Sequence, residues 1–150
     1  MAASLTLDIL TPTGPLVLSK SEDGKPSFSK DMEIAGVEIP GLLGEMGVLP
    51  GHIPFITPIK PGVLRFKHGG ESYRVAVGSG FLEISDEGRV TILADQARVP
   101  GDIDPDVASA QRDELRAELA KETRSIDDPI IQTKRQQLEW AECQLRAVQG

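Results

Sequence analysis

Asparagine is absent from this chain of 150 residues, and Cys143 is its only cysteine. Without asparagine there is no acceptor for N-linked glycosylation, and tight turns must use glycine, proline, aspartate or serine. A single cysteine excludes an intrachain disulfide and favours a reducing compartment. We interpret Cys143 as a small packing residue on a helix. The chain must then be stabilised by a packed core, and a chain of this length can form one.

Long hydrophobic runs and a surplus of positive charge are also missing. No apolar run approaches the ~20 residues that cross a bilayer, so direct membrane insertion is not expected. The net charge is −7 and the sequence pI is about 4.8. This balance argues against nucleic acid and against electrostatic docking on anionic lipid, because both need a basic surface. The start of the chain, MAASLTLDIL, shows neither a signal peptide nor an Arg-rich transit peptide.

Motifs for catalysis or metal binding are missing as well. His52 and His68 are the only two histidines, and neither forms a zinc-like spacing with Cys143. A P-loop is absent. Gly78-Ser79-Gly80 resembles the start of a dinucleotide fingerprint, but Glu83 stands where the third glycine is expected and no helix follows. We therefore interpret it as a turn or bulge between strands. The sequence predicts no catalytic residue, no metal site and no cofactor, and it gives a free-standing enzyme no recognisable substrate site.

Residues 4–99 have the pattern of a β structure. Apolar and polar residues alternate over residues 5–10, which is typical of a strand with one buried face. We expect a polar loop or hairpin tip over Ser19–Asp31, and hairpin loops over Lys67–Gly70 and Ser85–Arg89. Short apolar runs at roughly 8–12-residue spacing predict a sandwich or barrel. Further strands are expected at residues 16–18, 34–39, 63–66, 73–77, 81–84 and 90–93.

The hydrophobic period changes after Pro100-Gly101. Residues 104–125 predict a helix with Asp102 or Asp104 as N-cap, and Asp128 with Pro129 begins a second one. The expected apolar stripes are Val107, Ala108, Leu115, Leu119 and Ile126 on the first helix, and Ile131, Leu138, Ala141, Leu145 and Val148 on the second. Such a pair indicates an antiparallel helical hairpin. We predict a β-sandwich domain over 1–99 and a helical hairpin domain over 102–150.

The helical half is expected to be marginally stable alone. The first helix carries like-charged pairs at i,i+4, such as Glu114 with Glu118, and isolated helices of this length are near the limit of stability in water. The hairpin therefore needs to dock on the β half or on a partner. Two alternatives stay open, a permanently packed hairpin and a mobile one. Trp140 lies off the apolar stripe, where it either covers the β half or meets a partner.

The segment Gly44–Phe66 holds four prolines and four glycines around short apolar runs. Such punctuation predicts a chain that bends repeatedly at the rim of a small β structure. The segment resembles the Gly-Glu…Gly-x-x-Pro-Gly-His-x-Pro stretch of the ε subunit of F-type ATP synthases, which is called δ in mitochondria. Residues 74–81 and 90–97 look like strands of the same family. The likeness covers most of residues 4–148.

The resemblance implies an all-β sandwich of about ten strands, followed by the helical hairpin. It implies a non-catalytic rotor subunit in the central stalk of a proton-translocating ATP synthase. Its β domain would bind the γ subunit on one side and the c-ring on another. The resemblance makes Glu45, Pro50, Gly51 and His52 the candidates for the interface with the c-ring or γ. Taken alone, Glu45 is more simply interpreted as a solvated loop carboxylate, and His52 as a side chain that closes a turn, with a surface contact to a partner as its alternative.

The resemblance also implies a role for the helices. In several bacterial relatives they extend along γ into the catalytic head, where α and β subunits would be their partners, and inhibit ATP hydrolysis. The location implied is peripheral, on the cytoplasmic face of a bacterial inner membrane or the stromal face of a thylakoid.

An alternative function is a nucleotide-sensing module, in which the hairpin clamps ATP against the sandwich. Some relatives bind ATP through an Ile-Asp-x-x-Arg-Ala motif at the start of the first helix. Ile103, Asp104 and Ala108 match it and are weak candidates for ATP sensing, but Val107 replaces the arginine and removes its phosphate donors. Arg98 stands where relatives often carry an acidic residue. Tight ATP sensing is therefore not expected.

Overall fold

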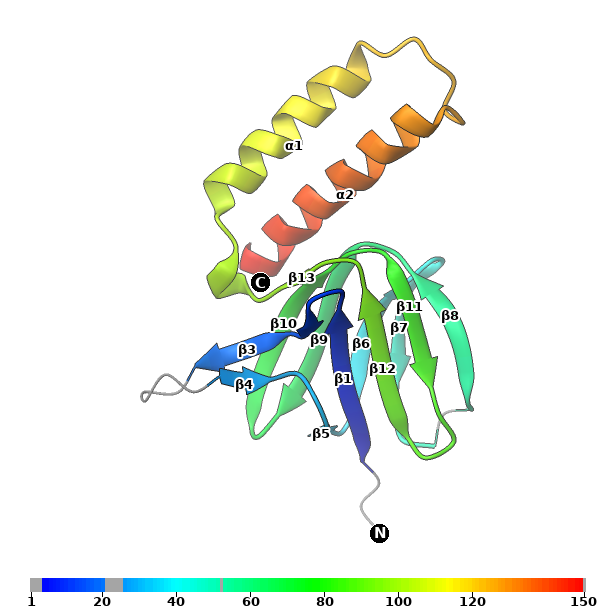
Figure 1. The fold of residues 1–150 in the computed structure, drawn as a ribbon, viewed down its shortest axis with the longest axis vertical. Coiled ribbons are helices and arrows are strands. Elements are labelled where there is room, and N and C mark those ends of the chain that lie inside the picture. Colours follow the sequence, from blue (N-terminus) through cyan, green and yellow to red (C-terminus); the bar gives the residue numbers. More distant parts are fainter. Residues whose placement is uncertain (1–3, 21–25, 52, 150) are drawn as a thin grey trace.

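A computed structural model describes residues 4–20, 26–51 and 53–149 of the chain. A β structure is followed by two C-terminal helices that run side by side (Figure 1), so the predicted fold class is confirmed. The described residues form thirteen strands instead of about ten, because four are only two or three residues long. The strands are β1 Leu5–Thr11, β2 Gly14–Pro15, β3 Val17–Lys20, β4 Pro26–Phe28, β5 Met32–Ile34, β6 Val37–Gly41, β7 Gly44–Val48, β8 Phe55–Ile59, β9 Gly62–His68, β10 Glu71–Val77, β11 Gly80–Ile84, β12 Arg89–Ala94 and β13 Ala97–Arg98.

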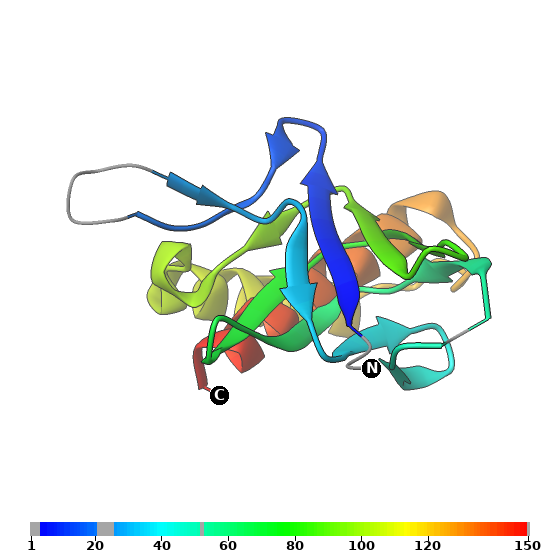
Figure 2. The same ribbon diagram turned by 90° about the horizontal axis from the view of Figure 1, so that it is seen from below.

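Eleven of these strands form one sheet. Its main path runs β13-β10-β9-β6-β8-β11-β12-β1-β2, with β5 paired to β1 and β7 paired to β6. The pair β1 and β12 is parallel, with Leu7 opposite Val90, while the other pairs are antiparallel. Strands β3 and β4 form a separate ribbon that projects from the side of the sheet (Figure 2).

Alternation along the strands builds a single core inside the curled sheet. β1 buries Leu5, Leu7 and Ile9, and β11 and β12 contribute side chains such as Leu82 and Ile92. These five residues are at most 1% exposed, and they belong to one hydrophobic cluster that draws on strands from both ends of the path. The period-2 pattern therefore identified the inward-facing residues correctly in these strands.

Some predicted details differ from the structure. The hairpin predicted around Lys67–Gly70 is present, but its loop is shorter than predicted, because β9 and β10 continue to a two-residue turn at Gly69-Gly70, where both φ angles are positive. Such a turn matches the twist of the flanking strands. The single strand expected over 34–39 is two, β5 and β6. Within Ser19–Asp31, β3 and β4 pair as a hairpin arm, and its tip at 21–25 lies outside the described residues.

The two helices are α1, Pro105–Ala120, and α2, Pro129–Gln149, preceded by the 3-10 turn η1, Pro100–Asp102. Both predicted proline starts are confirmed. Of the two predicted N-caps for α1, Asp104 is the one used, and the Asp128 carboxylate accepts from the backbone N of Ile130 at 2.9 Å. The extent predicted for the first helix was too long, since α1 ends at Ala120. Ile126 is therefore in the connection, and it is exposed, like Val107.

The hairpin sits on the sheet through α2, while α1 packs along α2 (Figure 1). A second hydrophobic cluster joins the two halves and consists of Val63, Ala76, Ile103, Trp140, Cys143 and Ala147. Trp140 thus covers the β half, which decides between its two interpretations for this structure. The predicted stripe of α2 is buried at Ile131, Ala141 and Leu145 and half-buried at Leu138 and Val148. The division into domains 1–99 and 102–150 stays a prediction.

Candidate functional site

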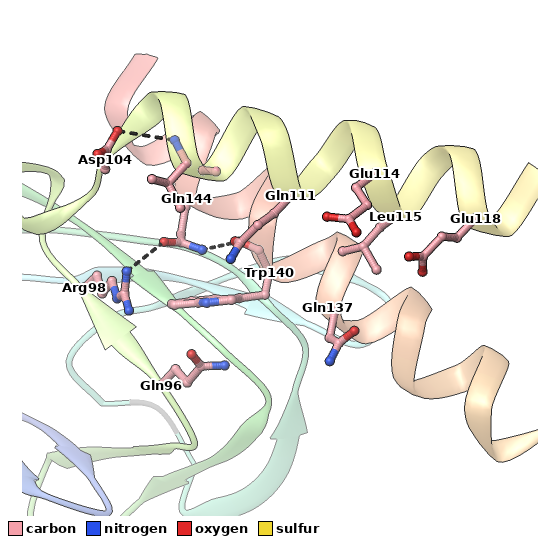
Figure 3. A pocket seen from close by; sticks show the side chains of 12 residues that line it. Gln96, Arg98, Asp104, Gln111, Glu114, Leu115, Glu118, Gln137, Trp140 and Gln144 are labelled. Atoms are coloured by element: carbon pink, nitrogen blue, oxygen red, sulfur yellow. Dashed lines mark hydrogen bonds between the residues drawn. The ribbon is translucent and has the colours of Figure 1, made fainter.

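A groove of about 560 Å³ lies where the helical hairpin meets the end of the sheet. We call it the helix–sheet groove. Figure 3 shows the Trp140 ring reaching from α2 towards Gln96 and Arg98, with Gln111 and Glu114 projecting from α1. Its lining comes from α1 with its N-cap residue, from α2, and from β13 with its preceding residue: Gln96, Arg98, Asp104, Val107, Ala108, Gln111, Glu114, Leu115, Glu118, Gln137, Trp140 and Gln144. The groove therefore depends on the hairpin being docked.

Of the three residues predicted as weak ATP-sensing candidates, Asp104 and Ala108 line this groove and Ile103 does not. The Asp104 carboxylate accepts from the backbone N of Asp106 at 3.0 Å and of Val107 at 3.3 Å, as an N-cap does. Ile103 is 7% exposed and belongs to the cluster under the hairpin, and Ala108 is 2% exposed. The structure brings these residues together, but each has a role in starting or seating α1.

The charge of the groove is negative. Asp104, Glu114 and Glu118 contribute three carboxylates, of which Glu118 is paired with Lys134 at 3.4 Å, and Arg98 is the one cation among the lining residues. The Arg98 guanidinium already donates through Nη1 to Gln144 Oε1 at 3.3 Å. A phosphate chain placed here would meet more negative than positive charge, which is unfavourable in a partly desolvated site. The groove is better suited to hydrogen bonding through amides than to binding polyphosphate.

Gln144 links α2 to β13 at the bottom of the groove through a hydrogen bond to Arg98. It is 4% exposed, accepts from Arg98 and donates through Nε2 to the backbone O of Trp140 at 3.4 Å. Sequence reasoning missed this glutamine. A usable signal existed, because Gln137, Trp140 and Gln144 are spaced i, i+3 and i+7 and so share one face of a helix.

Cys143 lies directly under α2 and fits its predicted role in packing. Its side chain is 0% exposed, and Sγ donates to the backbone O of Gly62 at 3.2 Å. Burial removes water from the thiolate and raises the pKa of Cys143 to about 12. The thiol is therefore protonated at neutral pH and is not a nucleophile while the hairpin is docked.

The candidates Glu45, Pro50 and Gly51 lie on β7 and the turn that follows it. Glu45 is exposed and faces Arg65 of β9, with 3.4 Å between Glu45 Oε1 and Arg65 Nη1. Gly51 has φ +86°, a conformation that favours glycine, and Pro50 precedes it in the same turn. His52 lies outside the described residues, so both of its interpretations stand. This segment and the helix–sheet groove have no lining residue in common.

The described residues form neither a metal-binding cluster nor a membrane-spanning helix. Residues 4–20, 26–51 and 53–149 contain no group of three or more His, Cys, Asp or Glu side chains arranged to hold a metal ion. Neither described helix is long and apolar enough to cross a membrane.

The chain resembles known proteins along most of its length. A family model described as "ATP synthase, Delta/Epsilon chain, beta-sandwich domain" matches residues 25–100. An ATP synthase epsilon chain of Nitratidesulfovibrio vulgaris (strain DP4) is 39% identical over 127 residues, covering 85% of this chain and 84% of that protein. One from Geobacter metallireducens is 36% identical over 141 residues, covering 94% and 91%.

A solved structure has the same fold over nearly the whole chain. It is a chain in the OSCP/F1/c-ring structure of the Euglena gracilis mitochondrial ATP synthase, with a TM-score of 0.70 and 26% identity. The match covers 99% of this chain and 82% of the other. On the sequence and the fold together, this chain belongs to the ATP synthase delta/epsilon chain family.

Proposed function

We propose that this chain is a non-catalytic subunit of the central stalk of a proton-translocating F-type ATP synthase, where its β-sandwich links the γ subunit to the c-ring. Three observations support the proposal. Bacterial relatives named ATP synthase epsilon chain match most of its length. A structural relative lies in an F1/c-ring assembly. The buried Cys143 thiol serves in packing under α2, and the Asp104 carboxylate in the groove caps the start of α1.

The helical hairpin is proposed as a movable arm that inhibits ATP hydrolysis when it extends towards the α and β subunits of the catalytic head. The observation that supports this proposal is the way the hairpin packs on the sheet. α2 rests on β9 and β10 through a few side chains, chiefly Trp140, Cys143 and Ala147, and α1 packs along α2. Moving α1 and α2 together as one body would separate the residues of that small cluster and break the Arg98–Gln144 hydrogen bond. A few kcal/mol of differential contact suffices to shift such a two-state equilibrium.

We further propose that residues 1–99 and 102–150 act as the fixed and the moving domain. The subunit would be peripheral to the membrane, on the cytoplasmic face of a bacterial inner membrane or the stromal face of a thylakoid. The bacterial relatives support the first of these locations.

The nucleotide clamp gains no support from the helix–sheet groove. Val107 lines it where an arginine would face phosphate, and three carboxylates stand against a single guanidinium. We therefore expect millimolar ATP to leave the melting temperature of the isolated chain unchanged.

The proposed movement of the hairpin can be tested by crosslinking it to the sheet in the complete complex. Arg98→Cys and Gln144→Cys, introduced with Cys143→Ala, replace the two side chains that a hydrogen bond joins in the native chain, with 3.3 Å between Arg98 Nη1 and Gln144 Oε1. A short bis-maleimide that a reductant can cleave then bridges them, and gel mobility reports the bridge. We expect rapid ATP hydrolysis in the bridged complex and slower hydrolysis after cleavage. A complex truncated after Pro100 should match the bridged one.

The unbridged triple variant is the control for the substitutions themselves. Equal rates in the bridged, cleaved and truncated complexes, with assembly intact, would show that the hairpin is structural here. That result would remove the inhibitory arm but leave the stalk role standing. Loss of the chain from the purified complex would instead contradict the stalk role.

A further inference from the structure

A second groove, of about 610 Å³, crosses the four neighbouring strands β7, β6, β9 and β10. In these strands core residues such as Val37 and Phe66 alternate with residues that point to the outer side of the sheet. On that side, register places Glu38 of β6 opposite Arg65 of β9, and Arg65 opposite Arg74 of β10. The groove therefore follows a cross-strand row that carries charge, and we call it the basic groove.

Positive charge is concentrated in the basic groove although the chain as a whole is acidic. Arg65, Lys67 and Arg74 line the groove, and Glu38 is the one carboxylate among its lining residues, whereas the net charge of the chain is −7. Arg65 forms one exposed ion pair, with 3.4 Å between its Nη1 and Glu45 Oε1. Arg65 and Arg74 are direct cross-strand partners, and like charges in such positions are unfavourable. An anion bound between the two arginines would turn this repulsion into attraction.

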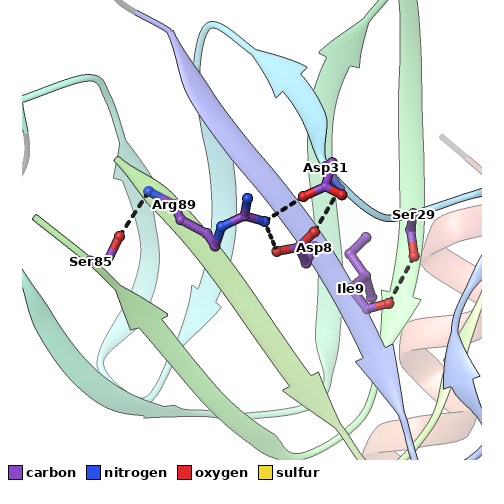
Figure 4. A network of polar contacts seen from close by, with 6 residues as sticks. All are labelled: Asp8, Ile9, Ser29, Asp31, Ser85 and Arg89. Atoms are coloured by element: carbon purple, nitrogen blue, oxygen red, sulfur yellow. Dashed lines mark hydrogen bonds and ion pairs between the residues drawn. The ribbon is translucent and has the colours of Figure 1, made fainter. Parts of the chain in front are cut away.

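Arg89 shows how another arginine of the same sheet is neutralised within the chain. Its guanidinium reaches the carboxylates of both Asp8 and Asp31, as Figure 4 shows. Arg74 differs, because it forms no ion pair or side-chain hydrogen bond with any residue that the structure describes. The donors of the Arg74 guanidinium are therefore available to a ligand in the groove.

The end of the basic groove on β6 and β7 is apolar. Gly36 and Gly47 leave this end without side chains, and a Cβ at Gly47 would have nothing within 4 Å. Leu49 lies beside Gly36, since a Cβ added at Gly36 would be 2.9 Å from Leu49 Cδ2. The leucine is 65% exposed, so most of its surface stays in water and contributes little to folding. The groove thus has a cationic end and an apolar end.

We propose that the basic groove binds a free single-chain anionic amphiphile, of the class of long-chain carboxylates. The head group would lie between Arg65 and Arg74, and the chain would run over Gly47 towards Leu49. Four strands at ~4.8 Å spacing span about 14 Å. With C–C bonds of ~1.5 Å, an extended chain of about a dozen carbon atoms has this length. The volume of 610 Å³ lies in the range of small-molecule pockets, roughly 300–1,000 Å³.

A free amphiphile fits the basic groove better than a membrane surface or a protein partner. An anionic bilayer would meet the field of the whole chain, whose net charge is −7, whereas one small anion mainly meets the cations within a Debye length of ~8 Å. A stable protein interface buries at least ~1,200 Å², which is more than a groove about 14 Å long provides. The proposed ligand does not depend on the stalk function, because the groove is formed by the chain alone.

The proposal is tested by calorimetric titration of the full-length chain with sodium dodecanoate below its critical micelle concentration. Dodecyltrimethylammonium has the same chain with the opposite charge, and hexanoate has the same head group with a short chain. We expect one dodecanoate per chain, bound at least tenfold more tightly than either comparison compound, because both ends of the groove contribute to binding.

Three variants locate the site. Arg74→Gln removes the unpaired guanidinium and should weaken dodecanoate binding at least tenfold. Lys121→Gln makes the same change of charge at an exposed residue that ends α1, and it should bind like the wild type. Gly47→Leu fills the apolar end without a change of charge and should also weaken binding at least tenfold. Circular dichroism melting curves check that all three variants fold.

Several results would overturn the proposal. Absence of dodecanoate binding, or wild-type affinity in both Arg74→Gln and Gly47→Leu, would mean that the groove is not the site. Equal affinity for dodecyltrimethylammonium would show unspecific detergent binding, and equal affinity for hexanoate would show a site for the anion only. Co-sedimentation with phosphatidylglycerol vesicles that Arg74→Gln abolishes would assign the groove to a membrane surface. A wild-type dimer that Gly47→Leu dissociates would assign it to a second copy of the chain.

Discussion

Trp140→Ala is expected to loosen the helical hairpin without unfolding the sheet. The indole is 9% exposed and packs in the cluster that seats α2 on β9 and β10. Removing a buried aromatic side chain costs about 3–5 kcal/mol in cores, through lost transfer energy and the cavity left behind. The ring borders the helix–sheet groove, where neighbours can relax, so the lower end, about 3 kcal/mol, applies.

Cys143 provides a direct measure of the loosening. It is the only cysteine of the chain and is 0% exposed beneath α2, so its thiol meets a reagent only after the hairpin lifts. When opening and closing are fast, the labelling rate is proportional to the opening equilibrium constant. Each 1.4 kcal/mol changes that constant tenfold, so about 3 kcal/mol corresponds to roughly a hundredfold faster reaction.

The assay is the rate of reaction with dithiobisnitrobenzoate in the absence of denaturant. Two controls separate local opening from global unfolding. Ile130→Ala changes a residue that is 51% exposed on the same helix and should leave the rate within about twofold. Leu82→Ala changes a fully buried residue of the sheet core and should lower the stability to urea by 2–5 kcal/mol with little effect on labelling.

Two results would refute the reasoning. An unchanged labelling rate in Trp140→Ala would mean that the indole does not hold the hairpin on the sheet. An equal acceleration in Leu82→Ala and Trp140→Ala would mean that Cys143 is reached only by unfolding of the whole chain. In the second case the hairpin and the sheet would be one cooperative unit, and an arm that moves independently would be excluded for the isolated chain.

Three further predictions concern single sites. Gly80→Ala is expected to destabilise the fold by roughly 3 kcal/mol in urea titration, because its Cβ would lie 1.8 Å from the backbone O of Leu93. Gly47→Ala is the control: its Cβ would meet nothing within 4 Å, so the substitution should leave the stability unchanged or raise it by up to about 1 kcal/mol. Asp104→Ala should lower the stability of the hairpin by about 1 kcal/mol and speed the labelling of Cys143, while Asp104→Ser should retain the cap and the stability. An equally large loss of stability in both variants would show that the carboxylate does more than cap α1. Burial raises the pKa of Cys143 from 9.0 to about 12, so stability is full below pH 9 and falls towards pH 12 as the unfolded thiol ionises and the folded one does not. By pH 10 the loss should be about 1 kcal/mol, and it should vanish in Cys143→Ala; parallel pH profiles for the two proteins would contradict the assignment.

The parts of the fold that could be predicted depend on local rules. Strand alternation identified the inward-facing residues of β1, because a residue that faces the core must be apolar whichever strand lies beside it. Asp104-Pro105 and Asp128-Pro129 marked both helix starts, since a capping carboxylate followed by proline satisfies the free N–H groups in any context. The turn at Gly69-Gly70 was placed too broadly, because Lys67 and His68 are polar and read as loop although they continue the ladder.

The candidate sites were less predictable, because they arise where distant segments meet. Nothing local in the sequence indicates that Arg98 would donate to Gln144, 46 residues later, or that Gly62 would accept from the Cys143 thiol. The exposed apolar pair of Phe81 and Leu93 has the same origin. Phe81 and Leu93 look like ordinary strand residues, and only the register of β11 with β12 shows that they are neighbours on the solvent face.

The negative groove bears on how an arm of this kind would be controlled. In a nucleotide-gated arm, ATP would have to bind the docked state more tightly than the extended one, since a ligand shifts an equilibrium only through such a difference. The carboxylates of Asp104, Glu114 and Glu118 with a single guanidinium give phosphate no such preference for the docked state. The docked state is then held by contacts within the chain, chiefly those of Trp140 and its cluster. In the proposed mechanism its release would then come from contacts of the extended helices with other subunits, and the position of the arm would follow the state of the catalytic head and not the concentration of free ATP.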